Sequence, residues 1–68
     1  MNEESFNMSI RKFLKNAGVR SQLEIEQAVA RALQQGRIKG NEKLPAKMTL
    51  EVEGLGLKAA FDGLIELE

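Results

Sequence analysis

The hydrophobic pattern of this 68-residue chain changes its period once, near Lys47. Before that point apolar residues recur every three to four positions, the spacing of one face of an α-helix. After it apolar and polar residues alternate over 47–53, the pattern of a half-buried β-strand. A chain of this length builds one small core, so we expect a single α+β domain over residues 1–68, with helices preceding strands.

The first predicted helix covers residues 3–17. The side chain of Asn2 can cap it, and Glu3 and Glu4 suit the positive end of a helix dipole. Gly18 is predicted to end this helix, because glycine readily adopts the left-handed conformation of a helix stop.

The second predicted helix covers residues 22–35. Ser21 and Glu24 match the capping box S-x-x-E, and Gly36 supplies the stop. Only two residues lie between the stop of the first helix and the cap of the second, so the helices are predicted to form a helical hairpin with Val19 plugging its corner.

Residues 37–46 are predicted to be a loop, and two strands, 47–53 and 57–67, are predicted to form a hairpin. Gly54-Leu55 fits a two-residue type II′ turn, which fixes the register. The expected pairs are Val52 with Leu57, Leu50 with Ala59, Met48 with Phe61, Glu51 with Lys58 and Lys47 with Asp62.

The end of the second strand leaves two alternatives. In the favoured one the strand runs on to the C-terminus, with Gly63 as a bulge or bend. In the other, Asp62-Gly63 forms a turn into a third strand, but that turn would pair Leu67 with Lys58 and mix the two faces.

The expected architecture is a two-helix hairpin followed by a β-hairpin (ααββ), with the helices packed on one face of the β-hairpin. The residues expected at the centre of the core are Phe13, Val29, Leu33, Leu50 and Phe61.

The composition argues against an enzyme. The chain has no histidine, cysteine or tyrosine, and its carboxylates, lysines and serines form no recognisable set. Four carboxylates share the polar side of the predicted hairpin, where clustered acids could hold a hard cation, but exposed strand faces are usually charged for solubility. They are Glu51, Glu53, Glu66 and Glu68. We therefore expect no catalytic residues, no cofactor and no metal.

Apolar residues outside the predicted core suggest a protein-interaction module. They are Met8, Leu23, Leu55 and Leu64. Scattered surface apolar residues are common, so this signal is weak. The partner would be another protein or a second copy of the chain, and an unpaired strand edge offers a further route to a homodimer.

The alternative function is weak nucleic-acid binding, because two helices and a hairpin resemble a winged helix-turn-helix. Its backbone contacts would come from Arg20, Arg31, Arg37 and Lys39. Glu24 and Glu26 stand where the recognition helix would meet base edges, and the sequence pI is about 6.3. Nucleic acid is therefore the less favoured partner.

No apolar run is long enough to span a membrane, and no charged start precedes an apolar segment, so we expect a cytoplasmic protein. Three segments carry a resemblance: FNMSIRKFLKNAGV, GNEKLPAKMTLE and FDGLIELE. With them the chain resembles, over nearly its whole length, a family of small bacterial proteins described as a domain of unknown function. That resemblance implies no activity, cofactor or partner.

Overall fold

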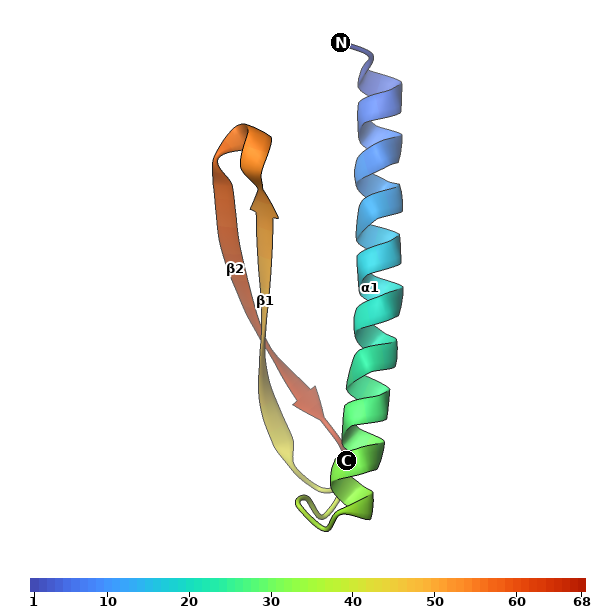
Figure 1. Cartoon of the computed structure of the whole chain (residues 1–68), viewed down its shortest axis with the longest axis vertical. Coiled ribbons are helices and arrows are strands. Elements are labelled where there is room, and N and C mark those ends of the chain that lie inside the picture. Colours follow the sequence, from blue (N-terminus) through green and yellow to red (C-terminus); the bar gives the residue numbers. More distant parts are fainter. The chain divides into compact units, whose positions relative to one another are not determined.

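The computed structural model describes all 68 residues as two units, residues 1–35 and residues 36–68. The first unit contains helix α1 (Glu3–Gln34), and the second contains strand β1 (Lys43–Val52), the short 3₁₀ helix η1 (Glu53–Leu55) and strand β2 (Leu57–Glu66) (Figure 1). The α+β class is confirmed. The packing of helix on hairpin stays a prediction, and each unit is described by itself.

The prediction of two helices is wrong, because α1 is a single helix of 32 residues that runs unbroken through Gly18 and Ser21 (Figure 1). Its predicted ends are confirmed. The Oδ1 atom of Asn2 accepts a hydrogen bond from the backbone N–H of Ser5 at 3.0 Å. At the other end Gly36 has the left-handed φ of 72° that follows a helix stop.

The helix continues through the expected break because the break would cost more than it gains. A glycine inside a helix costs about 1 kcal/mol relative to alanine, whereas a new pair of helix ends leaves several backbone groups without partners. The φ of Gly18 is not positive, so it does not form a stop. Ser21 does not cap a helix but lies half-buried inside one, in phase with Ala17 and Ile25.

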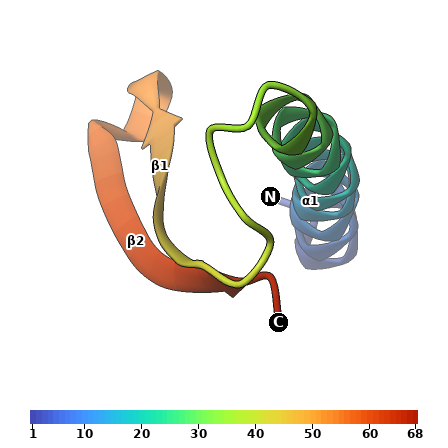
Figure 2. The same cartoon turned by 90° about the horizontal axis from the view of Figure 1, so that it is seen from below.

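The predicted register of the hairpin is confirmed at all five pairs. Strands β1 and β2 are antiparallel, with Met48 opposite Phe61 and Val52 opposite Leu57. β1 begins at Lys43, earlier than predicted, so the loop assignment is wrong for residues 43–46. Figure 2 shows the true loop leading from the end of α1 into β1.

The turn between the strands is not the predicted type II′ turn. Gly54 has no positive φ, whereas Gly56 has a φ of 62° and donates its N–H to the carbonyl oxygen of Glu53 at 3.0 Å. A 3₁₀ turn over Glu53–Leu55 followed by a left-handed glycine thus closes the hairpin. The register is unchanged because this four-residue loop has the same centre as the predicted turn.

β2 is one continuous strand, which confirms the favoured alternative over a third strand. Gly63 lies directly opposite Ala46, and the one-to-one pairing continues on both sides of it. The predicted bulge is therefore absent. Without a bulge, the residues on either side of Gly63 keep their faces.

The predicted core residues belong to both units. Phe13, Val29 and Leu33 lie on α1, whereas Leu50 and Phe61 lie on the hairpin. Within the helix Ala32 is buried and Val29 is half-buried. That these residues meet in one core between helix and hairpin stays a prediction, like the packing of the two units.

Candidate interaction surfaces

The continuity of α1 aligns apolar residues that were expected on two separate helices and in the corner between them. Met8, Val19 and Leu23 fall within about 60° around the helix at about 100° per residue. At a rise of about 1.5 Å per residue they extend over about 22 Å. Their side chains are between 50% and 64% exposed. We call these three residues the apolar line of α1. Val19 belongs to it instead of plugging a corner.

The opposite side of α1 carries a broader apolar stripe. Its members come from both predicted helices and share one side of the continuous helix: Phe6, Ile10, Phe13, Leu14, Ala17, Ile25, Ala28, Val29 and Ala32. Its large side chains are at least 37% exposed apart from the half-buried Val29. α1 therefore has apolar residues on two sides. Leu33 lies between the two sides, and Lys12 and Glu26 lie within the arc of the apolar line.

The two other predicted interaction residues belong to the hairpin. Leu55 ends the 3₁₀ turn and is 76% exposed, while Leu64 lies on β2 opposite Pro45. Leu64 shares the polar face of the hairpin with Lys58 and Asp62. The structure thus places Met8 and Leu23 in one unit and Leu55 and Leu64 in the other.

The two outer edges of the hairpin differ in their free backbone groups. The N–H of Leu67 donates to the carbonyl oxygen of Glu42 at 3.1 Å, one step beyond the strand ends. Because bonded and non-bonded pairs alternate in an antiparallel ladder, the pair of Pro45 and Leu64 is non-bonded. Pro45 therefore interrupts the outer edge of β1, while the outer edge of β2 offers free N–H and C=O groups from Lys58 to Glu66.

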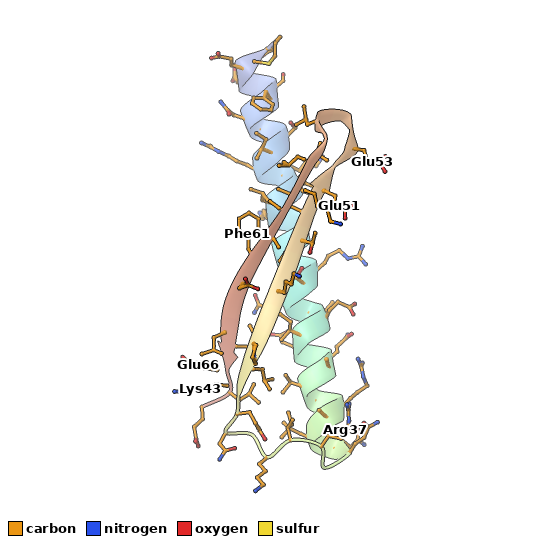
Figure 3. The ribbon with its side chains drawn as sticks, turned by 90° about the vertical axis from the view of Figure 1, so that its left-hand side faces the viewer. Arg37, Lys43, Glu51, Glu53, Phe61 and Glu66 are labelled. Atoms are coloured by element: carbon orange, nitrogen blue, oxygen red, sulfur yellow. The ribbon has the colours of Figure 1, made fainter.

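The predicted nucleic-acid contacts are distributed over both units. Arg20 and Arg31 lie within about 20° of each other on α1, three turns and about 16 Å apart. Arg37 and Lys39 lie in the loop that opens the second unit; Figure 3 labels Arg37 there. The two-helix motif that suggested nucleic-acid binding is not formed.

The four carboxylates on the hairpin do not converge. No group of three or more acidic side chains lies where it could hold a metal ion. In Figure 3 Glu51 and Glu53 lie near the turn, and Glu66 lies at the open end beside Lys43. The Nζ atom of Lys58 lies 3.9 Å from the Oε1 atom of Glu51, as their predicted pairing implies. This pair is exposed, and such pairs stabilise a fold little.

Glu42 organises the loop before β1, a role the sequence analysis missed. Its carboxylate accepts hydrogen bonds from the backbone N–H groups of Lys39 at 2.8 Å and Gly40 at 2.9 Å. These bonds, the one from Lys39 first, lower the pKa of Glu42 below its ordinary value. Gly40 has a φ of 105°, which an L side chain rarely adopts. A Gly-x-Glu sequence before a strand was the available signal.

These features define a small α+β protein with one long helix and a two-stranded hairpin. The chain belongs to the family of unknown function DUF6494, whose model matches residues 1–68. No curated protein and no solved structure matches it. α1 lacks the run of apolar residues that a helix needs to cross a membrane.

Proposed function

We propose that this protein is a non-enzymatic protein-interaction module of the bacterial cytoplasm and that it works as a homodimer. The observation that carries this proposal is the apolar line of α1. Met8, Val19 and Leu23 face away from the main stripe of their own helix and are at least half exposed. A helix with apolar residues on two sides has more apolar surface than one packed neighbour covers.

The charge balance favours a second copy as the partner. The chain has ten basic and ten acidic residues, and its formal net charge is zero. Two copies therefore meet without the long-range repulsion that keeps strongly charged proteins apart. The chain also has no cysteine, so no disulfide can stabilise it.

The experiment is a titration of labelled protein with unlabelled protein, followed residue by residue in NMR spectra. We expect concentration-dependent shifts at Met8, Val19 and Leu23, and we expect Leu23→Glu to weaken association because it places a charge in the contact. Leu23 is exposed on the helix, so the helical content of this variant should match that of the wild type. Leu64→Glu tests the hairpin in the same way.

Arg31→Glu is the matched control. It also introduces a glutamate on the surface of α1, but residue 31 lies away from the apolar line. It should leave self-association unchanged. A second arm of the titration uses mixed duplex DNA. Shifts at Arg20, Arg31, Arg37 and Lys39 with DNA, together with no concentration dependence at the apolar line, would replace this proposal with the alternative of a weak nucleic-acid binder.

A further inference from the structure

We propose that the outer edge of β2 pairs with the outer edge of β2 in a second copy, so that two hairpins form one four-stranded antiparallel sheet. This inference rests on the proposed self-association and names the strand that sets its geometry. It starts from the difference between the two hairpin edges. Both strands of a two-stranded sheet have a free edge, but only one of them is uninterrupted.

The outer edge of β1 is protected against pairing. Pro45 removes one of its donors, and Lys43 and Lys47 flank that position with two positive charges. The outer edge of β2 contains no proline between Leu57 and Glu66, and its pairing with β1 has no bulge. Because the outer edge of β1 is protected, the strand of a second copy that is available to β2 is another β2. Such a contact is two-fold symmetric and closes after two copies.

The free groups of β2 restrict the register between the copies. They belong to the even-numbered residues, so an antiparallel partner must place even residues opposite even residues. The apolar faces of the two hairpins then lie on the same side of the four-stranded sheet. The two-fold axis then passes through a residue of β2, and the two residues at the centre of the strand are Phe61 and Asp62.

Charges select Phe61 as the residue on the axis. An axis at Asp62 would set two Asp62 side chains directly opposite each other. With Phe61 on the axis, the two Asp62 side chains are only diagonal neighbours. Each Lys58 then lies diagonally next to Asp62 and Glu66 of the second copy, so the attractive pairs outnumber the repulsive one.

The apolar face supports the same register. Phe61 is 59% exposed, and Figure 3 shows its ring beside the middle of β2. On the axis it meets Phe61 of the second copy in a non-bonded pair, where side chains approach most closely. Leu57 then lies opposite Ile65 of the second copy, so the central apolar pair has a further apolar pair on each side.

Paired proline variants test the choice of edge. Thr49 and Ala60 lie opposite each other in a non-bonded pair, so each directs its N–H to an outer edge, Thr49 on β1 and Ala60 on β2. Pro45 occupies an equivalent position, which shows that the hairpin accommodates proline there. Ala60→Pro should raise the dimer Kd about tenfold or more, and Thr49→Pro should leave it unchanged.

Single cysteines test the register without relying on the proline variants. The chain has no cysteine, so one introduced thiol can form a disulfide only between copies. Opposed residues in a non-bonded pair are about 4.5 Å apart at Cα, within the range of a disulfide. Under mild oxidation Phe61→Cys should cross-link faster than Ala60→Cys, Asp62→Cys or Gly63→Cys.

The outcomes separate this inference from the proposed function. If the wild type stays monomeric at millimolar concentration, both are wrong. If the wild type dimerises but Ala60→Pro and Thr49→Pro dimerise equally well, or if no cysteine of β2 cross-links, self-association stands and the β2 edge is not its contact. If cross-linking is fastest at residue 60, 62 or 63, the edge is right and the proposed register is wrong.

Discussion

The hairpin and the helix of this protein differ in how many residues fix their geometry. In the hairpin, every predicted pair between β1 and β2 forms, although the turn that suggested the register is of another type. In α1, every local signal was read in the usual way, and the number of helices was still wrong. A register is restrained by many residue pairs at once, because a shift by one residue moves every side chain to the other face. A helix boundary depends on one or two residues, each worth about 1 kcal/mol.

The largest expected effect tests the continuity of α1. Gln22 would be the first residue of a second helix, a position that favours proline, but it lies in the interior of the observed helix. We expect Gln22→Pro to destabilise the protein by about 3 kcal/mol or more, because proline removes a helix hydrogen bond and clashes with the preceding turn. Circular dichroism and urea unfolding at one fixed protein concentration measure this.

Glu3→Pro is the control for this variant, because it places proline in the first turn of α1, where no helix hydrogen bond is lost. It should cost much less. Equal helicity in Gln22→Pro and wild type would mean that the chain has two helices after all.

The next effect distinguishes the observed turn from the predicted one. Gly56 has a φ of 62°, and Gly54 does not have a positive φ. Gly56→Ala should therefore cost about 1–2 kcal/mol, while Gly54→Ala should be close to neutral. Neither glycine has an atom within 4 Å of an added Cβ, so the comparison isolates backbone strain from crowding. In a type II′ turn the order of the two variants would be reversed, which urea unfolding of both proteins would reveal.

A smaller, stabilising effect is expected at Gly18. It has no positive φ, lies inside α1, and has open space around an added Cβ. Gly18→Ala should stabilise the protein by about 1 kcal/mol through better helix propensity. Thermal unfolding at matched concentration measures the change. A lower midpoint than that of wild type would indicate a left-handed glycine and thus a helix stop at this position.

The smallest effect concerns Glu42 and pH. Its pKa is lowered from an ordinary value of 4.5 by hydrogen bonds from Lys39 first and Gly40 second. A carboxylate with a lowered pKa in the folded state stabilises the protein above its unfolded pKa, and this contribution is lost as pH falls through the folded value. Below pH 4.5 wild type should therefore lose more stability than Glu42→Gln. Glu53→Gln is the control and should follow the wild type; identical acid profiles for all three would contradict this role.

The parts of the fold that were predictable are those with repeated signals. The alternation in β1 and β2 and the caps at Asn2 and Gly36 each follow from residue type and spacing. The missed continuity of α1 also had a signal, since Leu14, Ala17, Ser21 and Ile25 keep helical spacing across the supposed break. A capping box is a weak motif, because serine and glutamate are both tolerated inside helices.

The candidate surfaces were less accessible to sequence reasoning. Met8 and Leu23 stood out as apolar residues outside the predicted core, but their alignment with Val19 depends on the continuous helix. The asymmetry of the hairpin edges required knowing that Pro45 lies in β1 at a non-bonded position. Residues 43–46 were assigned to a loop, because proline between charged residues is typical of loops. The position of Pro45 in a strand was therefore not predicted.

The measurement that tests the central claim most directly is the mass of the native protein by sedimentation equilibrium, from micromolar to millimolar concentration. If the protein self-associates as proposed, its apparent mass should rise from 7.6 kDa toward twice that value as concentration increases. Leu23→Glu and Ala60→Pro should shift the rise to higher concentration, and Arg31→Glu and Thr49→Pro should not. A constant mass of 7.6 kDa over the whole range, with the helix and hairpin folded, would contradict the account.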